Sequence, residues 1–303
     1  MAYERMTVAE FFANVSTEEA ARTMTWKSRF GGKDFICPHC QHEKYYAYKC
    51  EPEIRKCRGC SAHVRLRVGT VFENTKVPML LWVRAIFLAM QGKRGISALE
   101  LKRQLKMSSY GTAWSMLHRI REALRQKDEE YKLRDVIELD GAVFGRKETG
   151  NQTEVLVAIE SKDWVDEKGR QKSKAGFAKV MVAPESKAKV QAFVDQVIAK
   201  DSMVNTDGKP ALQNLKNVDQ DSQVVAADPV VLAHWLPWVH KFISNAKAWV
   251  VGTHHGVDSK YLGRYLAEYT YRFNRRHDPN SLFHRALTAC AIGVPATAGS
   301  LFG

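Results

Sequence analysis

The chain has 303 residues, of which 45% are hydrophobic, and its 46 Lys and Arg against 33 Asp and Glu give a formal net charge of +13. This composition supplies enough apolar surface for a folded core and excludes an intrinsically disordered protein. Because no stretch approaches the roughly 18 uninterrupted apolar residues of a membrane span, and no basic start precedes an apolar segment at the N-terminus, we expect a cytoplasmic protein with no membrane partner.

The basic excess is concentrated in the first part of the chain. Residues 1–130 contain 23 Lys and Arg against 14 Asp and Glu, whereas the remainder contains 23 against 19. A concentrated positive charge favours binding of a polyanion through phosphate contacts and counterion release. A merely soluble basic surface is the alternative interpretation of the charge alone. The length favours one large catalytic domain with one or two small modules.

Two C-x-x-C pairs, with sixteen residues between them, form the clearest local motif. This spacing allows two pairs of thiolates to close around one tetrahedral Zn²⁺ ion. Residues 45–48 and 62–67 alternate in the manner of short strands, so we predict a zinc ribbon over residues 31–75, behind a helical segment over residues 1–30. The metal would serve folding rather than catalysis, and a redox role for the pairs is the alternative. The predicted ligands of this structural Zn²⁺ are Cys37, Cys40, Cys57 and Cys60.

Three helices are predicted within residues 76–130. Apolar residues at helical spacing end at Gly92, a second helix covers residues 97–105, and a third begins at about Tyr110. The tight turn before the third helix contains serines that can cap it, which favours a helix-turn-helix segment for DNA binding. A plain helical linker packed on the catalytic domain is the alternative.

Extended segments replace the helical pattern after residue 130. The mixed order of strands and helices is typical of an α/β fold, and it predicts a ribonuclease H-like catalytic domain over residues 131–285 with a C-terminal tail over residues 286–303. The predicted elements are strands at 136–143, 154–159 and 177–182, a helix at 186–200, a strand ending at Asp207, a strand at 223–227, and then helices.

Two aspartates end predicted strands in this basic chain. Asp140 lies on the same face of its strand as Glu138 and precedes Gly141, and Asp207 precedes Gly208. Two carboxylates brought side by side can hold a pair of Mg²⁺ ions for an in-line displacement at phosphorus. A turn role is the alternative for either aspartate taken singly.

Several motifs together resemble one known family. The Gly252-Thr253-His254-His255 stretch, then residues 261–268 and 271–276, are similar to the C-terminal signature of bacterial insertion-sequence transposases, which join a zinc ribbon to a DDE-type catalytic domain. The resemblance covers nearly the whole chain. It extends to residues 138–141 and 145–147, 206–208, 112–114 and 119–121, and the cysteine pairs.

This resemblance implies a DNA transposase that binds the terminal inverted repeats of an insertion sequence and performs two-metal-ion strand cleavage and strand transfer. The implied partners are double-stranded DNA, as terminal repeats and as target, and further copies of the chain in a homodimer or larger synaptic assembly. The implied location is the cytoplasm, in association with the nucleoid. A domesticated transposase acting as a DNA-binding regulator and a stand-alone nuclease are the alternatives.

The family usually has Glu or Asn seven positions before a lysine as its third catalytic residue. In this chain, counting back from Lys247 reaches His240, which gives a D-D-H catalytic set with Asp140 and Asp207. Lys247 is expected to be the fourth catalytic residue and to steady DNA phosphate. An imidazole nitrogen suits Mn²⁺ better than Mg²⁺, so we expect Mn²⁺ to support at least as much activity as Mg²⁺. Packing among neighbouring aromatic residues is the alternative role for His240, and Glu268 is the rival third acid.

Basic and polar side chains of the ribbon, the third helix and the C-terminal signature are predicted to contact DNA. For the last three of them, a solvated helix C-terminus is the alternative. The predicted DNA-binding residues are Arg58, Arg65, Arg67, Tyr110, Thr112, Arg119, Arg121, Arg125, Asn274, Arg275 and Arg276.

Overall fold

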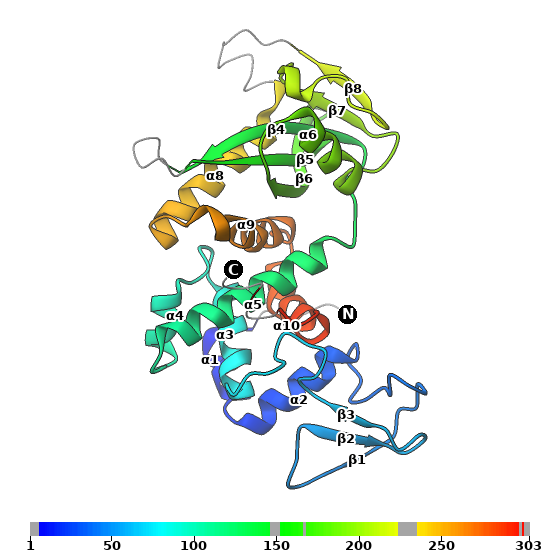
Figure 1. The fold of residues 1–303 in the computed structure, drawn as a ribbon, viewed down its shortest axis with the longest axis vertical. Helices are drawn as coiled ribbons and strands as arrows, with labels where there is room; N and C mark the ends of the chain where they lie inside the picture. Colours follow the sequence, from blue (N-terminus) through cyan, green and yellow to red (C-terminus); the bar gives the residue numbers. More distant parts are fainter. Residues whose placement is uncertain (1–5, 146–151, 166–167, 224–234, 297–298, 300–303) are drawn as a thin grey trace. The chain divides into compact units, whose positions relative to one another are not determined.

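The computed structural model describes residues 6–145, 152–165, 168–223, 235–296 and 299. The chain divides into two compact units, each with its own core (Figure 1). The first unit contains residues 1–127 and 277–303, and the second contains residues 128–276. Within the described ranges, no helix combines the length and the hydrophobicity needed to cross a bilayer.

The first unit is built mainly from helices whose ends follow from their capping residues. The side chain of Thr7 accepts a hydrogen bond from Glu10 N–H at the start of α1, and Ser97 accepts one from Glu100 N–H at the start of α4. Gly92 ends α3, as predicted. The helices are α1 (Val8–Asn14), α2 (Glu18–Arg29), α3 (Met79–Gln91), α4 (Ala98–Gln104), α5 (Tyr110–Asp128), the short 3₁₀ helix η3 (Pro279–Ser281) and α10 (Leu282–Ile292).

The C-terminal helix α10 belongs to the core of this first unit. It packs against α2 and α3, and Phe283 meets the stacked rings of Phe11 and Phe87, whose centroids are 3.7 Å apart. The predicted boundary at residue 285 therefore falls inside a helix. Burial of these three rings joins the two ends of the chain in one hydrophobic core.

A small antiparallel sheet precedes α3. Its strand order is β1-β2-β3, with β1 (Tyr45–Ala47), β2 (Ile54–Cys57) and β3 (His63–Arg65). The first and third strands lie within the segments predicted to be extended. The central strand, β2, was not predicted, because its residues Ile54-Arg55-Lys56-Cys57 show no apolar alternation.

The second unit is built around a five-stranded mixed sheet with the order β6-β5-β4-β7-β8. Strands β4, β5 and β6 are antiparallel neighbours, whereas β7 and β8 run parallel to β4. The predicted strand at 223–227 lies almost wholly outside the described residues, and β8 ends just before it. The strands are β4 (Val136–Phe144), β5 (Thr153–Val165), β6 (Gln171–Val182), β7 (Met203–Thr206) and β8 (Asp219–Ser222).

Helices cover both faces of this sheet, which makes three layers. Helix α6 (Lys187–Val197) and the 3₁₀ helix η2 (Pro210–Leu212) pack on one face. Helices α8 (Pro237–His254) and α9 (Ser259–Asn274) pack on the other. Because side chains alternate along β4, its Ile137 and Leu139 enter the α6 core, whereas Ala142 and Phe144 enter the α8 core.

Candidate active site and zinc site

The four cysteines of the two C-x-x-C pairs meet in space. All four Sγ atoms lie within 4.8 Å of one another, and the Sγ–Sγ distance is 3.5 Å both from Cys37 to Cys60 and from Cys40 to Cys57. Sulfur atoms around a tetrahedral Zn²⁺ lie about 3.8 Å apart, because each Zn–S bond is about 2.3 Å long. The cluster therefore fits a structural Zn²⁺, as predicted. In the part of the chain that the structure describes, no other group of three or more His, Cys, Asp or Glu gathers its ligand atoms this closely.

The two halves of the cluster fold alike. In the first half, Cys37 N–H donates to the carbonyl of His42, and Gln41 N–H donates to the carbonyl of Cys37. In the second half, Cys57 N–H donates to the carbonyl of Ala62, and Ser61 N–H donates to the carbonyl of Cys57. Gln41 and Ser61, which follow the second cysteines, both adopt left-handed φ angles, 59° and 60°. Burial raises the pKa of the Cys57 thiol, but the backbone N–H groups of Cys60 and Gly59 outweigh burial and lower it to about 7. In contrast, the backbone N–H of His42 lowers the pKa of the Cys40 thiol, but burial and the neighbouring thiols outweigh it and raise this pKa to about 12. The thiolate is the form that binds zinc.

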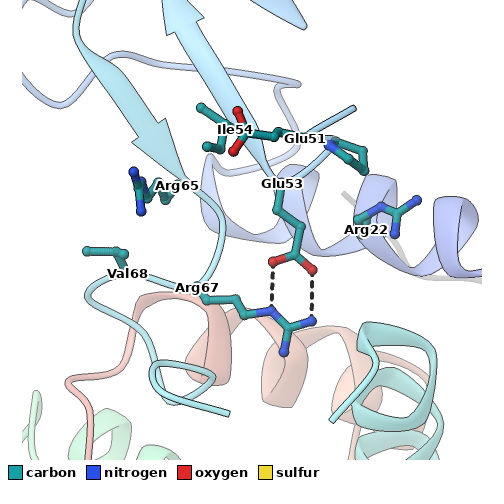
Figure 2. Close-up of a pocket in the computed structure, with 8 residues that line it drawn as sticks. Arg22, Glu51, Glu53, Ile54, Arg65, Arg67 and Val68 are labelled. Atoms are coloured by element: carbon teal, nitrogen blue, oxygen red, sulfur yellow. Dashed lines mark hydrogen bonds and ion pairs between the residues drawn. The ribbon is translucent and has the colours of Figure 1, made fainter. Parts of the chain in front are cut away.

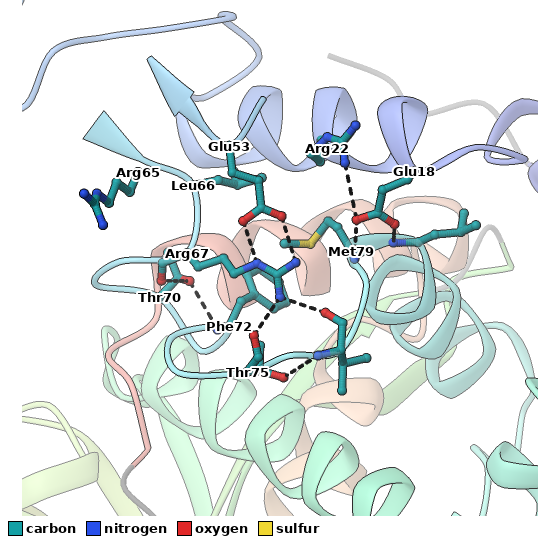
Figure 3. Close-up of polar contacts among 12 residues, drawn as sticks. Glu18, Arg22, Glu53, Arg65, Leu66, Arg67, Thr70, Phe72, Thr75 and Met79 are labelled. Carbon is teal, nitrogen blue, oxygen red and sulfur yellow. Dashed lines mark hydrogen bonds and ion pairs between the residues drawn. The ribbon is translucent and has the colours of Figure 1, made fainter. Parts of the chain in front are cut away.

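Arg67 joins the ribbon to the loop before α3. Its guanidinium donates to both carboxylate oxygens of Glu53, at 2.7 and 2.8 Å, and to the carbonyls of Val77 and Thr75, at 2.7 and 3.2 Å (Figure 3). Glu53 and Arg67 also border an open pocket of about 470 Å³. Figure 2 shows Arg22 and Arg65 on opposite sides of Glu53. These contacts engage the Arg67 side chain within its own unit, so they favour a structural role for a residue predicted to contact DNA.

The other predicted DNA contacts of the first unit fall into two groups. Arg119 donates to the carbonyls of Val71 and Glu73, at 2.9 and 2.8 Å, which favours a structural role. Arg121 is 1% exposed, so its side chain is not accessible to DNA in this structure. Residues that remain exposed or half-buried, and therefore open to a partner, are Arg58, Arg65, Tyr110 and Thr112. Arg125 is also exposed, but it pairs with Glu122 at 2.6 Å.

In the second unit, the two predicted catalytic aspartates share one cation. The Nζ of Lys209 lies 2.8 Å from Asp140 Oδ1 and 3.0 Å from Asp207 Oδ2. Burial lowers the pKa of the Lys209 ammonium, but the charges and hydrogen bonds of Asp140 and Asp207 outweigh burial and raise it above its ordinary value. The predicted pair therefore does lie side by side, around a positive charge supplied by the chain itself.

The strand pairing explains this placement. β4 pairs with β7 only as far as Glu138 and Asn205, so Asp140 lies just beyond the end of its parallel neighbour. Asp207 follows the last residue of β7, and Gly208, with a φ of 75°, turns the chain so that Lys209 points back towards the two aspartates. β4 runs to Phe144, one residue past the predicted end at residue 143, so Asp140 lies within the strand and not at its end, where it had been expected.

Two further side chains border the pair. The Nδ1 of His240, on α8, is 3.6 Å from Asp140 Oδ2, so the structure places the predicted third residue beside the first. The Oε2 of Glu185, in the loop between β6 and α6, is 3.8 Å from Lys209 Nζ. Neither Glu185 nor Lys209 was predicted from the sequence. The signals available were an acid directly before the predicted helix at 186–200 and a lysine two residues after Asp207.

Glu138 anchors the helix that carries His240. Its Oε2 accepts hydrogen bonds from the N–H groups of Trp238 and Val239, at 2.7 and 2.8 Å. Trp238 and Val239 are the two residues before His240. Burial raises the pKa of the Glu138 carboxyl although these donors lower it. A carboxylate at a helix N-terminus satisfies free N–H groups and complements the helix dipole. Strand β4 therefore contributes Asp140 directly and sets the position of His240 through Glu138.

Replacing Glu138 by Ala is expected to lower the free energy of unfolding by about 1–3 kcal/mol for each buried N–H left without a partner. The Glu138→Gln variant keeps an acceptor oxygen, so its loss should be smaller. Urea unfolding of the full-length chain and its two variants measures both values. Equal stability of the Ala variant and the wild type would contradict the anchoring role.

The remaining candidates of the second unit are Lys247 and Glu268. The Lys247 ammonium is 5.7 Å from the ring centroid of Phe144, at the end of β4. Glu268, the rival third acid, is 2% exposed on α9 and forms an ion pair with Arg272 at 3.9 Å. The contacts of Glu268 therefore favour a structural role, whereas those of His240 favour a place in the site.

The three predicted DNA contacts at the end of α9 are engaged inside the second unit. Asn274 Oδ1 accepts from Ala178 N–H at 2.7 Å, and its Nδ2 donates to Tyr131 Oη at 2.7 Å. Arg275 pairs with Asp128 at 2.8 Å, and Arg276 donates to the carbonyls of residues 175 and 176. These bonds tie α9 to β6 and favour a packing role over a DNA contact.

Comparison with known families matches a segment of each unit. Residues 132–274, which include Asp140, Asp207 and His240, match the model of the ISXO2-like transposase domain. Residues 16–63, which include all four clustered cysteines, match that of the transposase zinc-ribbon domain. No curated protein and no solved structure gives a significant match to the chain. The chain therefore carries an ISXO2-like transposase domain behind a transposase zinc ribbon, as its motifs had led us to expect.

Proposed function

We propose that this protein is the transposase of an insertion sequence, which binds the terminal inverted repeats of its element and performs DNA strand cleavage and strand transfer. The observation that carries the proposal is the pairing of Asp140 and Asp207 around one cation at the end of two parallel strands. The sheet order and the mixture of antiparallel and parallel pairs support a ribonuclease H-like fold for the catalytic unit, residues 128–276.

The residues present fit the divalent metal that such chemistry uses. Asp140 and Asp207 already bind a positive charge, and carboxylate oxygens are the ligands that Mg²⁺ and Mn²⁺ prefer. We assign Asp140, Asp207 and His240 as the residues that would hold Mg²⁺ or Mn²⁺. Bound metal of this kind activates an attacking oxygen and stabilises the leaving one.

The chain's own lysines would act on the phosphate. Lys247 lies two helical turns from His240 on α8 and is exposed, so its ammonium is free to steady a DNA phosphate beside the carboxylates. If a divalent metal binds to Asp140 and Asp207, the flexible side chain of Lys209 can turn from these carboxylates to a DNA phosphate.

Recognition of the element ends is assigned to the zinc ribbon and the first unit. Helices α4 and α5, with the turn between them, form a helix-turn-helix candidate whose exposed N-terminal residue on α5 is Tyr110. Beside this end lies an open groove of about 550 Å³, bordered by Lys76, Thr112 and Ser115. Because the two ends of the element must be joined to one target DNA, we expect the active species in the nucleoid to be a dimer or a larger synaptic assembly.

The proposal is tested by incubating the full-length protein with linear DNA that carries the element ends, in Mg²⁺ and in Mn²⁺. Cleaved ends and joined products are separated on denaturing gels. End-specific cleavage followed by joining supports a transposase. Specific binding to the ends without cleavage in either metal favours a DNA-binding regulator, and cleavage that ignores the ends favours a simple nuclease.

Replacing His240 by Ala is expected to lower strand joining by about 10–100-fold, the scale of effect seen when groups around a bound metal are removed. In the wild type, Mn²⁺ should support at least as much joining as Mg²⁺, because imidazole suits Mn²⁺ better. The matched variant His240→Glu restores the acid usual in the family, so it should regain joining and prefer Mg²⁺. Wild-type joining by His240→Ala would overturn the assignment.

A further inference from the structure

A third carboxylate lies beside the paired aspartates. Glu185 stands in the loop between β6 and α6, and its Oε2 is 3.8 Å from the Lys209 ammonium that Asp140 and Asp207 share. Its backbone is fixed, because Glu185 N–H donates to Glu154 Oε2 at 2.5 Å, and the neighbouring Ala183 N–H donates to the carbonyl of Glu154 at 3.1 Å. The loop therefore holds Glu185 against β5 with its side chain directed towards the site.

The strand beneath makes room for this carboxylate. Gly141, directly after Asp140, has no side chain, and a Cβ built on it would lie 1.7 Å from Glu185 Oε2. The backbone of Gly141 does not adopt a left-handed φ, so the glycine is not required by its conformation. Its missing side chain instead leaves the space that Glu185 occupies beside Asp140.

The charges around Lys209 are unbalanced. Asp140, Asp207 and Glu185 bring three negative charges when ionised, and Lys209 offsets only one of them. A divalent cation would balance the three carboxylates better than the single ammonium does.

We propose that Glu185 is an additional metal ligand of the active site, which supplies the third carboxylate that His240 does not. This inference rests on the proposed function and adds one residue to its metal site. The ligand set becomes Asp140, Asp207 and Glu185, with His240 as a fourth donor. In this arrangement the acid comes from the loop before α6 rather than from α8 or α9.

The test is the binding of Mn²⁺ alone to the zinc-loaded, full-length protein without DNA. The electron paramagnetic resonance signal of free Mn²⁺ gives the dissociation constant directly. Glu185→Gln is expected to raise this constant by at least about tenfold, since even residues that only support a ligand affect metal affinity by 10–100-fold. Asp219→Asn is the matched control, because it removes an exposed carboxylate on β8 that contacts neither Lys209 nor the loop of Glu185, and it should change the constant by less than about twofold.

A second variant removes Glu185 from the site without changing any carboxylate. In Gly141→Ala the new methyl group takes the position of Glu185 Oε2, and the flexible side chain must turn away while the fold is kept. This variant should match Glu185→Gln in its Mn²⁺ affinity and keep the wild-type urea midpoint. Wild-type affinity in both variants would overturn the proposal.

Asp140→Asn separates this inference from the function on which it rests. If Asp140→Asn weakens Mn²⁺ binding while Glu185→Gln and Gly141→Ala do not, the metal site stands and only the role of Glu185 fails. If Asp140→Asn itself binds Mn²⁺ as tightly as the wild type, the metal site at the paired aspartates fails with it.

Discussion

Replacing Asp140 by Asn is expected to abolish both cleavage of the element ends and strand joining, with a loss of about 1,000-fold or more. Asparagine keeps the shape of the side chain and an oxygen that can accept from Lys209, but it removes the negative charge that attracts a divalent cation. A 1,000-fold loss corresponds to about 4 kcal/mol, which is within what metal-assisted charge stabilisation contributes to such displacements. Gel assays of cleavage and joining with both metals measure the loss.

The same chemical change elsewhere in the unit provides the control. Asp219 is exposed on β8, so Asp219→Asn should cleave and join as the wild type does. Urea unfolding of both variants checks that the fold is kept, since asparagine retains an oxygen that can accept from Lys209. Joined products from Asp140→Asn at the wild-type rate would show that the chemistry takes place at another site.

Local signals in the sequence account for most of the elements that were predicted correctly. Gly92 ends α3 and Ser97 caps α4, as the residue types require, so these helices are predicted to within a residue or two. The cysteine spacing is sufficient for the zinc site, because ligand type and spacing together define a ribbon. Strand β2 could not be predicted, since its pairing with β1 and β3 depends on partners on both sides rather than on its own pattern.

The catalytic cluster was only partly predictable. Asp140 and Asp207 follow recognisable apolar runs, whereas Glu185 and Lys209 reach the site through loops whose paths depend on the sheet.

At the end of α9, the sequence predicted DNA contacts for side chains that the fold uses for packing. Asn274 and the two arginines after it have the composition of a DNA contact, but the fold uses their donors to bind β6 and Asp128. Composition identifies donors, and only the fold determines which acceptors they meet.

Loss of one zinc ligand is expected to remove the ribbon's structure and with it the recognition of the element ends. In Cys57→Ser, three thiolates remain, and the small module has too little core to fold without its metal. Structural zinc contributes about 10–16 kcal/mol to the folding of comparable peptides, which exceeds the stability of most whole domains. Zinc content measured by mass spectrometry should fall from one ion per chain to almost none, and mobility-shift assays should lose the complex with the element ends.

Cys50 offers a matched control for this variant. It lies between the two pairs in the sequence but is exposed and outside the cluster, so Cys50→Ser should keep both zinc and end binding. The catalytic unit has its own core over residues 128–276, and Cys57→Ser should therefore still bind Mn²⁺ with wild-type affinity. A zinc-free variant that still selects the element ends would assign recognition to the helices of the first unit alone. A variant that loses Mn²⁺ binding as well would show that the two units do not fold independently.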